Sequence, residues 1–184
     1  MRPARGRRGL RRRRPRLPRR RVPLIKLAVI SDTHMPRGTR RLPKKCLRLL
    51  RESDRILHAG DFVSAAVYEE LGKLAPVDGV AGNMDEEDLR LVLPAKLVVE
   101  HQGVRIGLVH DAGPAVGRAG RLAEAFPGCD AVVYGHTHVP EATKVGETWI
   151  LNPGSPTERR SAPHHGMIEL EVEGGRLDVR TYVL

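Results

Sequence analysis

The chain has 184 residues, enough for one well-buried domain and too few for two of ordinary size. Hydrophobic residues make up 40% of it, which allows a packed core, and the formal net charge of +10 suggests a nucleic-acid binder. However, residues 1–21 hold 12 arginines and no acid, and without them 20 basic side chains face 22 acidic ones, a net charge of −2. The domain that follows is therefore not basic.

The arginine- and proline-rich segment 1–23 offers almost nothing to bury, so we expect a disordered tail ahead of one domain over 24–184. Its interpretation stays open between a cationic arm for nucleic-acid phosphates, a transit peptide and an artefact of the assigned translation start. The lack of serine and of an amphipathic period disfavours the transit peptide. We favour an inert tail.

The first part of the domain alternates strand-like and helix-like segments. An apolar run at 24–30 predicts a buried strand, and shorter strands are expected at 55–59 and 77–81. Apolar residues at helical spacing predict two helices, one behind Pro43 at its first turn and one capped by Ser64. Each strand ends at a polar motif, which in open α/β sheets is where ligands bind.

From residue 96 the pattern changes. Strands are expected at 96–101 and 104–110, joined by Gln102-Gly103, and an amphipathic helix spans Val116 to Phe126. Further strands are expected at 131–134 and near 141–145, 147–151, 166–173 and 176–183. This order predicts an α/β fold in which two β-sheets face each other with helices outside.

Seven polar residues in these motifs have the chemistry of a two-metal site. Carboxylates, imidazoles and one amide oxygen suit Mn²⁺, Fe or Zn²⁺ better than a thiolate-preferring metal. Each motif alone has an ordinary explanation as a turn or a core histidine, but the two imidazoles of Gly135-His136-Thr137-His138 point to one side of an extended segment. The seven are Asp32, His34, Asp61, Asn83, His110, His136 and His138.

In this order the motifs resemble the calcineurin-like metallophosphoesterases over roughly residues 24–183, and the Asn152-Pro153-Gly154-Ser155 turn resembles their small YfcE-type phosphodiesterase branch. The resemblance implies a four-layer αββα sandwich with two divalent metal ions, Mn²⁺ first, with Fe, Zn²⁺ or Ni²⁺ as alternatives. It assigns one ion to Asp32, His34 and His138. It assigns the other to Asn83, His110 and His136, with Asp61 bridging both.

The resemblance also implies in-line attack of a metal-bridging hydroxide on a phosphodiester, with catalytic roles for Asp61, His34 and Asn83. The amide oxygen of Asn83 can ligate a metal while its NH₂ holds a substrate oxygen. Met84 stands where many family members have a histidine that protonates the leaving group. This departure favours esters with good leaving groups, such as aryl or cyclic esters.

Several neighbouring polar residues have supporting roles. Asp85 and Asp111 are candidates to orient metal-binding histidines without binding the metal themselves, with a plain turn or capping role as an equal alternative. His58 lies in an apolar strand and is expected to be a buried, hydrogen-bonded histidine. Asn152 and Ser155 are expected to fix their turn.

We therefore expect a cytoplasmic hydrolase of small phosphodiesters. No apolar stretch approaches the roughly 18 residues of a membrane span, and the isolated Cys46 and Cys129 fit a reducing compartment. Two alternatives are a non-catalytic protein-interaction scaffold on the same fold and a nuclease guided by the basic tail, although nucleic acid is not the favoured partner. The sequence leaves homo-oligomerisation open.

Overall fold

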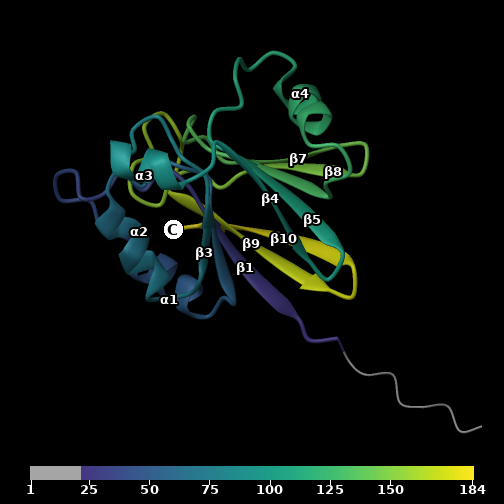
Figure 1. The fold of residues 1–184 in the computed structure, drawn as a ribbon, viewed down its shortest axis with the longest axis horizontal. Coiled ribbons are helices and arrows are strands. Elements are labelled where there is room, and N and C mark those ends of the chain that lie inside the picture. Colours follow the sequence, from purple (N-terminus) through teal and green to yellow (C-terminus); the bar gives the residue numbers. More distant parts are fainter. Residues whose placement is uncertain (1–21) are drawn as a thin grey trace, which may run out of the picture.

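The computed structural model describes residues 22–184, which fold into two facing five-stranded sheets (Figure 1). The strand orders are β10-β9-β1-β2-β3 and β4-β5-β6-β8-β7. The predicted α/β fold of two facing sheets is therefore confirmed. The interpretation of the arginine-rich tail falls on residues 1–21, which lie outside the described part.

The first sheet combines three parallel strands with an antiparallel hairpin at its edge. Its strands are β1 (Ile25–Ile30), β2 (Arg55–His58), β3 (Val77–Gly79), β9 (Gly166–Glu173) and β10 (Arg176–Val183). In the second sheet β5, β6 and β8 run parallel and the outer strands antiparallel. Its strands are β4 (Lys96–His101), β5 (Val104–Val109), β6 (Ala131–Tyr134), β7 (Glu141–Val145) and β8 (Thr148–Asn152).

Helices α1 (Lys44–Arg51) and α2 (Ala65–Gly72) pack on the first sheet, and α4 (Arg118–Ala125) packs on the second (Figure 1). Helix α3 (Glu87–Val92) was not expected, because Leu89 is its one buried residue and no apolar period marks it. Ser64 precedes α2 as predicted, but its hydroxyl has no partner within residues 22–184 and forms no capping bond.

Alternation along the strands sorts the core into three layers. Leu27 of β1 and Leu151 of β8 point into the space between the sheets. Their neighbours Ala28 and Ile150 point outward, toward α1 and α2 in one case and toward α4 in the other. Because side chains of a strand alternate between its faces, each sheet is covered on both sides. The result is the four-layer αββα sandwich implied by the resemblance.

Two parallel strand pairs, one in each sheet, carry the polar motifs. β1 pairs with β2, aligning Ile30 with His58, and β5 pairs with β6, aligning Val109 with Tyr134. Parallel strands end at the same edge of their sheet, so the motifs that follow all four strands meet at one edge of the sandwich.

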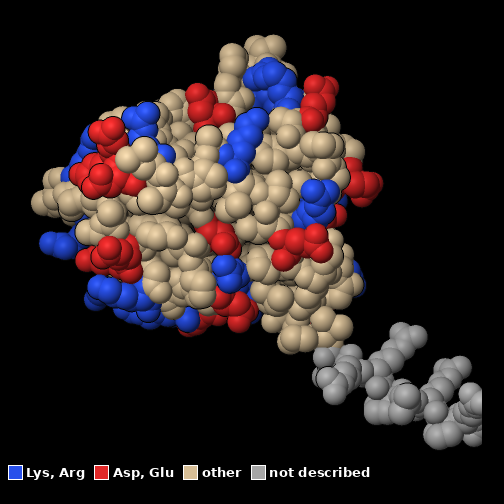
Figure 2. All heavy atoms as spheres, in the orientation of Figure 1, with Lys and Arg blue, Asp and Glu red and all other residues tan. Residues whose placement is uncertain are grey.

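The surface of this domain gives no sign of a basic patch on the face shown in Figure 2, where positive and negative side chains are interspersed. This agrees with the net charge of −2 beyond residue 21. Cys46 and Cys129 are buried thiols, as expected of small core residues. Within residues 22–184 we find no helix that combines the length and apolarity needed for a membrane crossing.

His58 is fully buried in β2, stacked on the Phe62 ring at 3.5 Å between centroids, with its Nε2 3.3 Å from the Thr33 hydroxyl. The expectation of a buried, hydrogen-bonded histidine is confirmed. Burial lowers the pKa of His58 from 6.5 to about 3, against the opposing effect of the Asp61 carboxylate and with smaller contributions from nearby His110 and His34.

A lowered pKa in the folded state makes stability depend on pH. The contribution of His58 is fully present above pH 6.5 and is lost as the pH falls toward about 3, because the unfolded chain then binds the proton more readily. At about 1.4 kcal/mol per pKa unit the loss amounts to several kcal/mol. We predict that His58→Gln flattens the decline of the free energy of unfolding over this range, measured by urea denaturation of metal-free protein. Equal pH slopes in both proteins would contradict the assignment.

Candidate active site

Asp32, His34 and His138 form the first group of candidate ligands, and all three are buried. The Nε2 atoms of His34 and His138 are 3.2 Å apart, and His138 Nε2 is 3.3 Å from Asp32 Oδ1. These separations are those of donor atoms that surround a single cation. The group expected to bind one metal is therefore assembled around one point.

Asn83, His110 and His136 form the second group. Asn83 Oδ1 lies 2.9 Å from His110 Nε2 and 3.0 Å from His136 Nδ1. His110 is buried, His136 is half-buried and Asn83 is exposed. This half of the site thus opens to solvent, where a substrate can approach.

Asp61 lies between the two groups. Its Oδ2 is 3.6 Å from His34 Nε2 and 3.4 Å from His110 Nε2. Its other oxygen accepts a 2.8 Å hydrogen bond from the Met84 backbone N–H. Asp32 also comes within reach of Asp61 and His110, a closeness that the sequence did not suggest. All seven predicted residues are brought together at one edge of the sandwich.

The backbone at the site is held in an uncommon conformation. Eight non-glycine residues of the described chain have positive φ, and five of them are in the predicted set. These are Asp32 (55°), His34 (45°), Asp61 (60°), His136 (68°) and His138 (61°). Such conformations cost on the order of 1–3 kcal/mol each and persist only where surrounding structure enforces them. The fold therefore accepts an energetic cost at five of the seven residues whose side chains form the cluster.

The glycines of the motifs are required by close packing. A Cβ on Gly82 would lie 2.1 Å from Asp61 Oδ1, and one on Gly135 would lie 2.1 Å from the Ser31 hydroxyl. A Cβ on Gly60 would lie 2.6 Å from His110 Nδ1. Each glycine therefore lets one motif approach a ligand of another.

The donor set fits divalent cations. His110 Nδ1 donates to the Ala59 carbonyl at 2.8 Å, and His138 Nδ1 to the Glu158 carbonyl, so that each ring turns Nε2 toward the cluster. Metal-binding histidines are typically oriented in this way. Buried carboxylates also need positive charge nearby, and the cluster holds two, Asp32 and Asp61.

The pKa values show how the cluster balances charge. Burial lowers the pKa of His34 despite the carboxylates of Asp61 and Asp32, which favours the neutral, metal-binding imidazole. Burial alone raises the pKa of Asp61, but His110 and the Met84 N–H outweigh it and hold that pKa below its ordinary value. Burial also lowers the pKa of His110, yet the hydrogen bond and charge of Asp61 raise it overall. The carboxylate at the centre therefore stays ionised.

Asp85 and Asp111 differ in what they do. Asp85 is buried and accepts 2.7 Å hydrogen bonds from the backbone N–H groups of Val63 and Gly82, tying the loop after Asp61 to the loop of Asn83. It therefore supports two ligand loops rather than a histidine. Asp111 is exposed and accepts from the Gly113 N–H at 2.8 Å, the plain turn role.

Asn152 and Ser155 fix their turn as expected, by accepting from the backbone N–H groups of Gly154 and Glu158 at 2.8 and 2.9 Å, and the turn also contacts the site. Asn152 Nδ2 donates to the Gly135 carbonyl at 3.1 Å, and the Ser155 hydroxyl donates to the Asp32 carbonyl at 2.7 Å. The sequence did not single out Ser31, whose hydroxyl donates to Asp32 Oδ2, although it directly precedes a predicted ligand.

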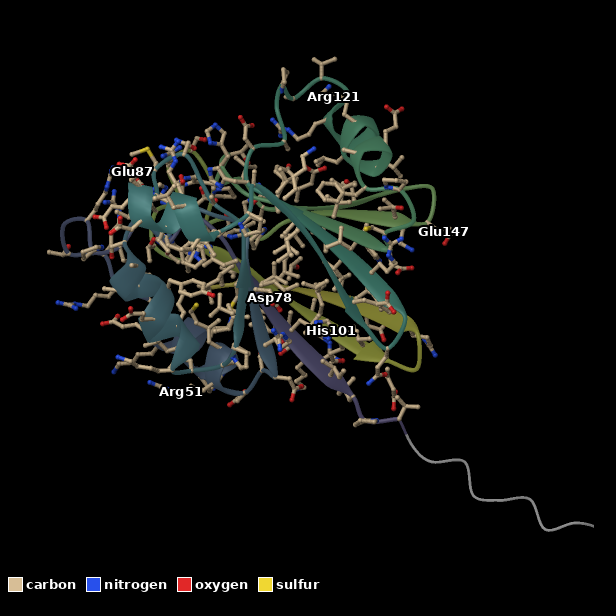
Figure 3. All side chains as sticks on the ribbon, viewed as in Figure 1. Arg51, Asp78, Glu87, His101, Arg121 and Glu147 are labelled. Carbon is tan, nitrogen blue, oxygen red and sulfur yellow. The ribbon has the colours of Figure 1, made fainter. Side chains whose placement is uncertain are left out.

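Glu158 was missed entirely. Its Oε2 lies 3.8 Å from His34 Nε2, and its Oε1 pairs with Arg40 Nη2 at 2.8 Å. Only its position after the Asn-Pro-Gly-Ser turn could have suggested it. His101 lies at the turn between β4 and β5 (Figure 3), whereas His110 follows the other end of β5. Arg159 donates to the Pro163 carbonyl at 3.0 Å.

We predict that Gly82→Ala lowers metal content sharply while leaving the fold intact, because the new methyl group displaces the Asp61 backbone and carboxylate. Metal bound per chain, measured by elemental analysis after dialysis against Mn²⁺, checks this. The matched control is Gly72→Ala in α2, where a Cβ meets nothing within 4 Å. Wild-type metal content in Gly82→Ala would refute the packing argument.

Comparison with known proteins agrees with this geometry. A probable metallophosphoesterase of Methanothermobacter thermautotrophicus is 36% identical over 154 residues, which cover 83% of this chain and 88% of that protein. Phosphodiesterase MJ0936 of Methanocaldococcus jannaschii is 26% identical over 146 residues, 71% of this chain and 83% of that protein. The crystal structure of Chaetomium thermophilum Vps29 matches with a TM-score of 0.72 at 22% identity, over 87% of this chain and 97% of that one, and this likeness concerns the fold alone.

The family model of the calcineurin-like phosphoesterase superfamily domain matches residues 25–175. Together with the donor groups of the structure, it supports a phosphoester hydrolase that uses divalent metal. The chain therefore belongs to the calcineurin-like phosphoesterase superfamily.

Proposed function

We propose that this protein hydrolyses phosphodiesters with two divalent metal ions, Mn²⁺ by preference. The observation that carries the proposal is the position of Asp61 Oδ2, within 3.6 Å of His34 Nε2 on one side and 3.4 Å of His110 Nε2 on the other. Asp32, His34 and His138 would hold one ion, and Asn83, His110 and His136 the other. Asp61 would be shared by both.

When bound, the two ions supply Lewis-acid polarisation of the phosphoryl oxygens and lower the pKa of the attacking water. Asp61 contributes the negative charge that offsets repulsion between neighbouring cations. Asn83, exposed at the open side, would ligate through its Oδ1 and offer its NH₂ to a phosphoryl oxygen. His34, which is buried, would bind the first ion and would also face the leaving group.

The preference for diesters is part of the proposal. Met84 has no proton to donate to a departing oxygen, so esters whose oxygen leaves as a stable anion would be favoured. The name of one relative, phosphodiesterase MJ0936, also supports a preference for diesters. We also propose a cytoplasmic location, on the strength of two isolated, buried cysteines.

A protein-interaction scaffold is the second candidate, favoured by one observation. Several solved structures with this fold are Vps29 proteins, and one of them is bound to a cyclic peptide. Against a purely structural role, every one of the seven donor positions in this chain is occupied by a residue that can ligate a metal. Hydrolytic activity therefore discriminates the two.

We predict that Asp61→Asn lowers the rate of bis-p-nitrophenyl phosphate hydrolysis by more than about a hundredfold. Even the loss of a residue that only hydrogen-bonds to a metal ligand typically lowers metal affinity or activity by about 10- to 100-fold. Removing the shared charge should also reduce the bound Mn²⁺. Release of p-nitrophenolate and metal content per chain are the measurements.

The matched control is Asp178→Asn, the same substitution at an exposed position of β10. It should keep wild-type turnover and metal content. If Asp61→Asn turns over like the wild-type protein, the shared-ligand mechanism is wrong.

A further inference from the structure

A cavity of about 400 Å³ lies beside the candidate active site and takes no part in the proposed metal binding. It starts at Met35, the residue after His34, and continues to Ser64 at the start of α2. A β-bridge between Met35 and Val63 holds the segment after His34 against the segment after Asp61. The cavity is therefore flanked by the chain segments that follow two candidate ligands.

An ion pair connects the cavity to the cluster. Arg40 lines the cavity, and its Nη2 is 2.8 Å from Glu158 Oε1. The other Glu158 oxygen is 3.8 Å from His34 Nε2. Glu158 thus links Arg40 of the cavity lining to His34 of the cluster, and its own backbone N–H donates to the Ser155 hydroxyl.

The lining combines apolar and cationic groups. Met35, Leu42 and Val67 contribute apolar side chains, and two arginines contribute positive charge: Arg41, which is exposed, and Arg40, which is paired with Glu158. Ser64 is also among the lining residues, and its hydroxyl has no hydrogen-bond partner within residues 22–184.

We propose that this cavity binds an aromatic arm of a phosphodiester whose phosphate lies at the metal cluster. Guanidinium groups favour the faces of aromatic rings and anions, and the apolar lining side chains suit a flat apolar ring. The proposal rests on the proposed function and narrows its substrate class. Met84 argues for the same arm, because an aryl oxide departs without being protonated. Glu70, exposed at the cavity edge, disfavours an arm with a second anionic group on that side.

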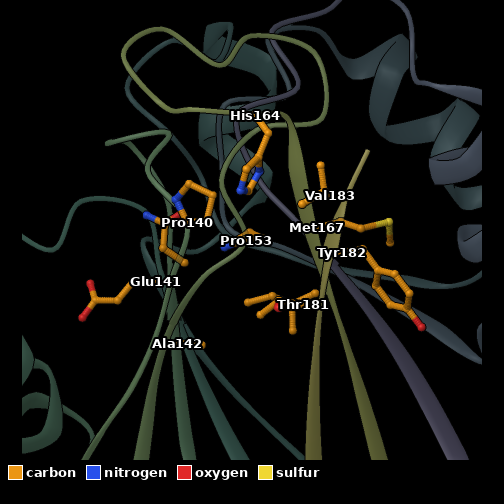
Figure 4. Close-up of a pocket in the computed structure, with 11 residues that line it drawn as sticks. Pro140, Glu141, Ala142, Pro153, His164, Met167, Thr181, Tyr182 and Val183 are labelled. Atoms are coloured by element: carbon orange, nitrogen blue, oxygen red, sulfur yellow. The ribbon is translucent and has the colours of Figure 1, made fainter.

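A second cavity provides the contrast. It measures about 300 Å³ and lies between the β7–β8 and β9–β10 strands, with Met167 and Tyr182 in its wall (Figure 4). None of the seven candidate ligands lines it. It therefore serves as an internal reference for non-specific binding.

Methionine methyl groups report separately on the proposed subsite, the metal cluster and the second cavity, since the chain has only 4 methionines. Met35 lines the proposed subsite, Met84 lies beside the metal cluster and Met167 lines the second cavity. In metal-free protein with labelled methionine methyls, titration with 2-naphthalenesulfonate should shift Met35 saturably and leave Met167 unmoved. Methanesulfonate, an anion without a ring, should shift neither. An unmoved Met35, equal responses of Met35 and Met167, or an equal response to both anions would overturn the proposal.

Inhibition tests whether the cavity is part of the substrate site. With Mn²⁺, 2-naphthalenesulfonate should compete with bis-p-nitrophenyl phosphate. Ala66 is an exposed residue of α2 that lines the cavity. Ala66→Trp should therefore fill part of the cavity and raise the inhibition constant of 2-naphthalenesulfonate about tenfold or more. The control Ala125→Trp, at an exposed alanine of α4, should not.

Non-competitive inhibition, or an unchanged constant in Ala66→Trp, would refute the subsite. If the wild-type protein hydrolyses no ester at all, the proposed function fails instead. The methionine titration still decides in that case whether the cavity binds an aromatic anion.

Discussion

Two carboxylates, Asp32 and Asp61, are buried within reach of each other among four imidazoles. Like charges this close in a dry environment repel strongly unless cations lie among them or protons neutralise them. The protein keeps the Asp61 carboxyl ionised, because His110 and the Met84 N–H lower its pKa against the effect of burial. Much of the surrounding structure can be understood as the means of holding this arrangement in place.

The sandwich supplies that means. Pairs of parallel strands from two sheets end at one edge, so that residues far apart in the chain meet there. Left-handed backbone conformations turn the side chains inward, and Gly60, Gly82 and Gly135 let the loops approach one another. Asp85 and Ser155 then fix the loops through backbone hydrogen bonds. Positional precision comes from these surrounding contacts, and there is no room beside Asp61 even for a methyl group at Gly82.

The sequence predicted most of the fold, and the structure brings the seven candidate ligands together, for identifiable reasons. Buried strands such as β1 are largely apolar runs, which the sequence shows directly. Gly-His-Thr-His does bring two imidazoles to the cluster, but from a bend with positive φ at both histidines and not from the expected extended segment. Helix α3 was not predicted, because Leu91 and Val92 are exposed and its apolar residues do not follow a helical period. Glu158 and Arg40 were not predicted, because Glu158 approaches His34 and Arg40 only in the folded structure and lies more than a hundred residues from both along the chain. For Asp111 adjacency left two roles equally open, and its side chain takes the turn role by accepting from the Gly113 N–H.

The number and place of the metal ions test the central claim most directly. We predict that crystals grown with Mn²⁺ show two anomalous scattering peaks on either side of Asp61 Oδ2, about 3.5–4 Å apart. Asp32, His34 and His138 should surround one peak, and Asn83, His110 and His136 the other. A single peak, or none at saturating Mn²⁺, would contradict the account.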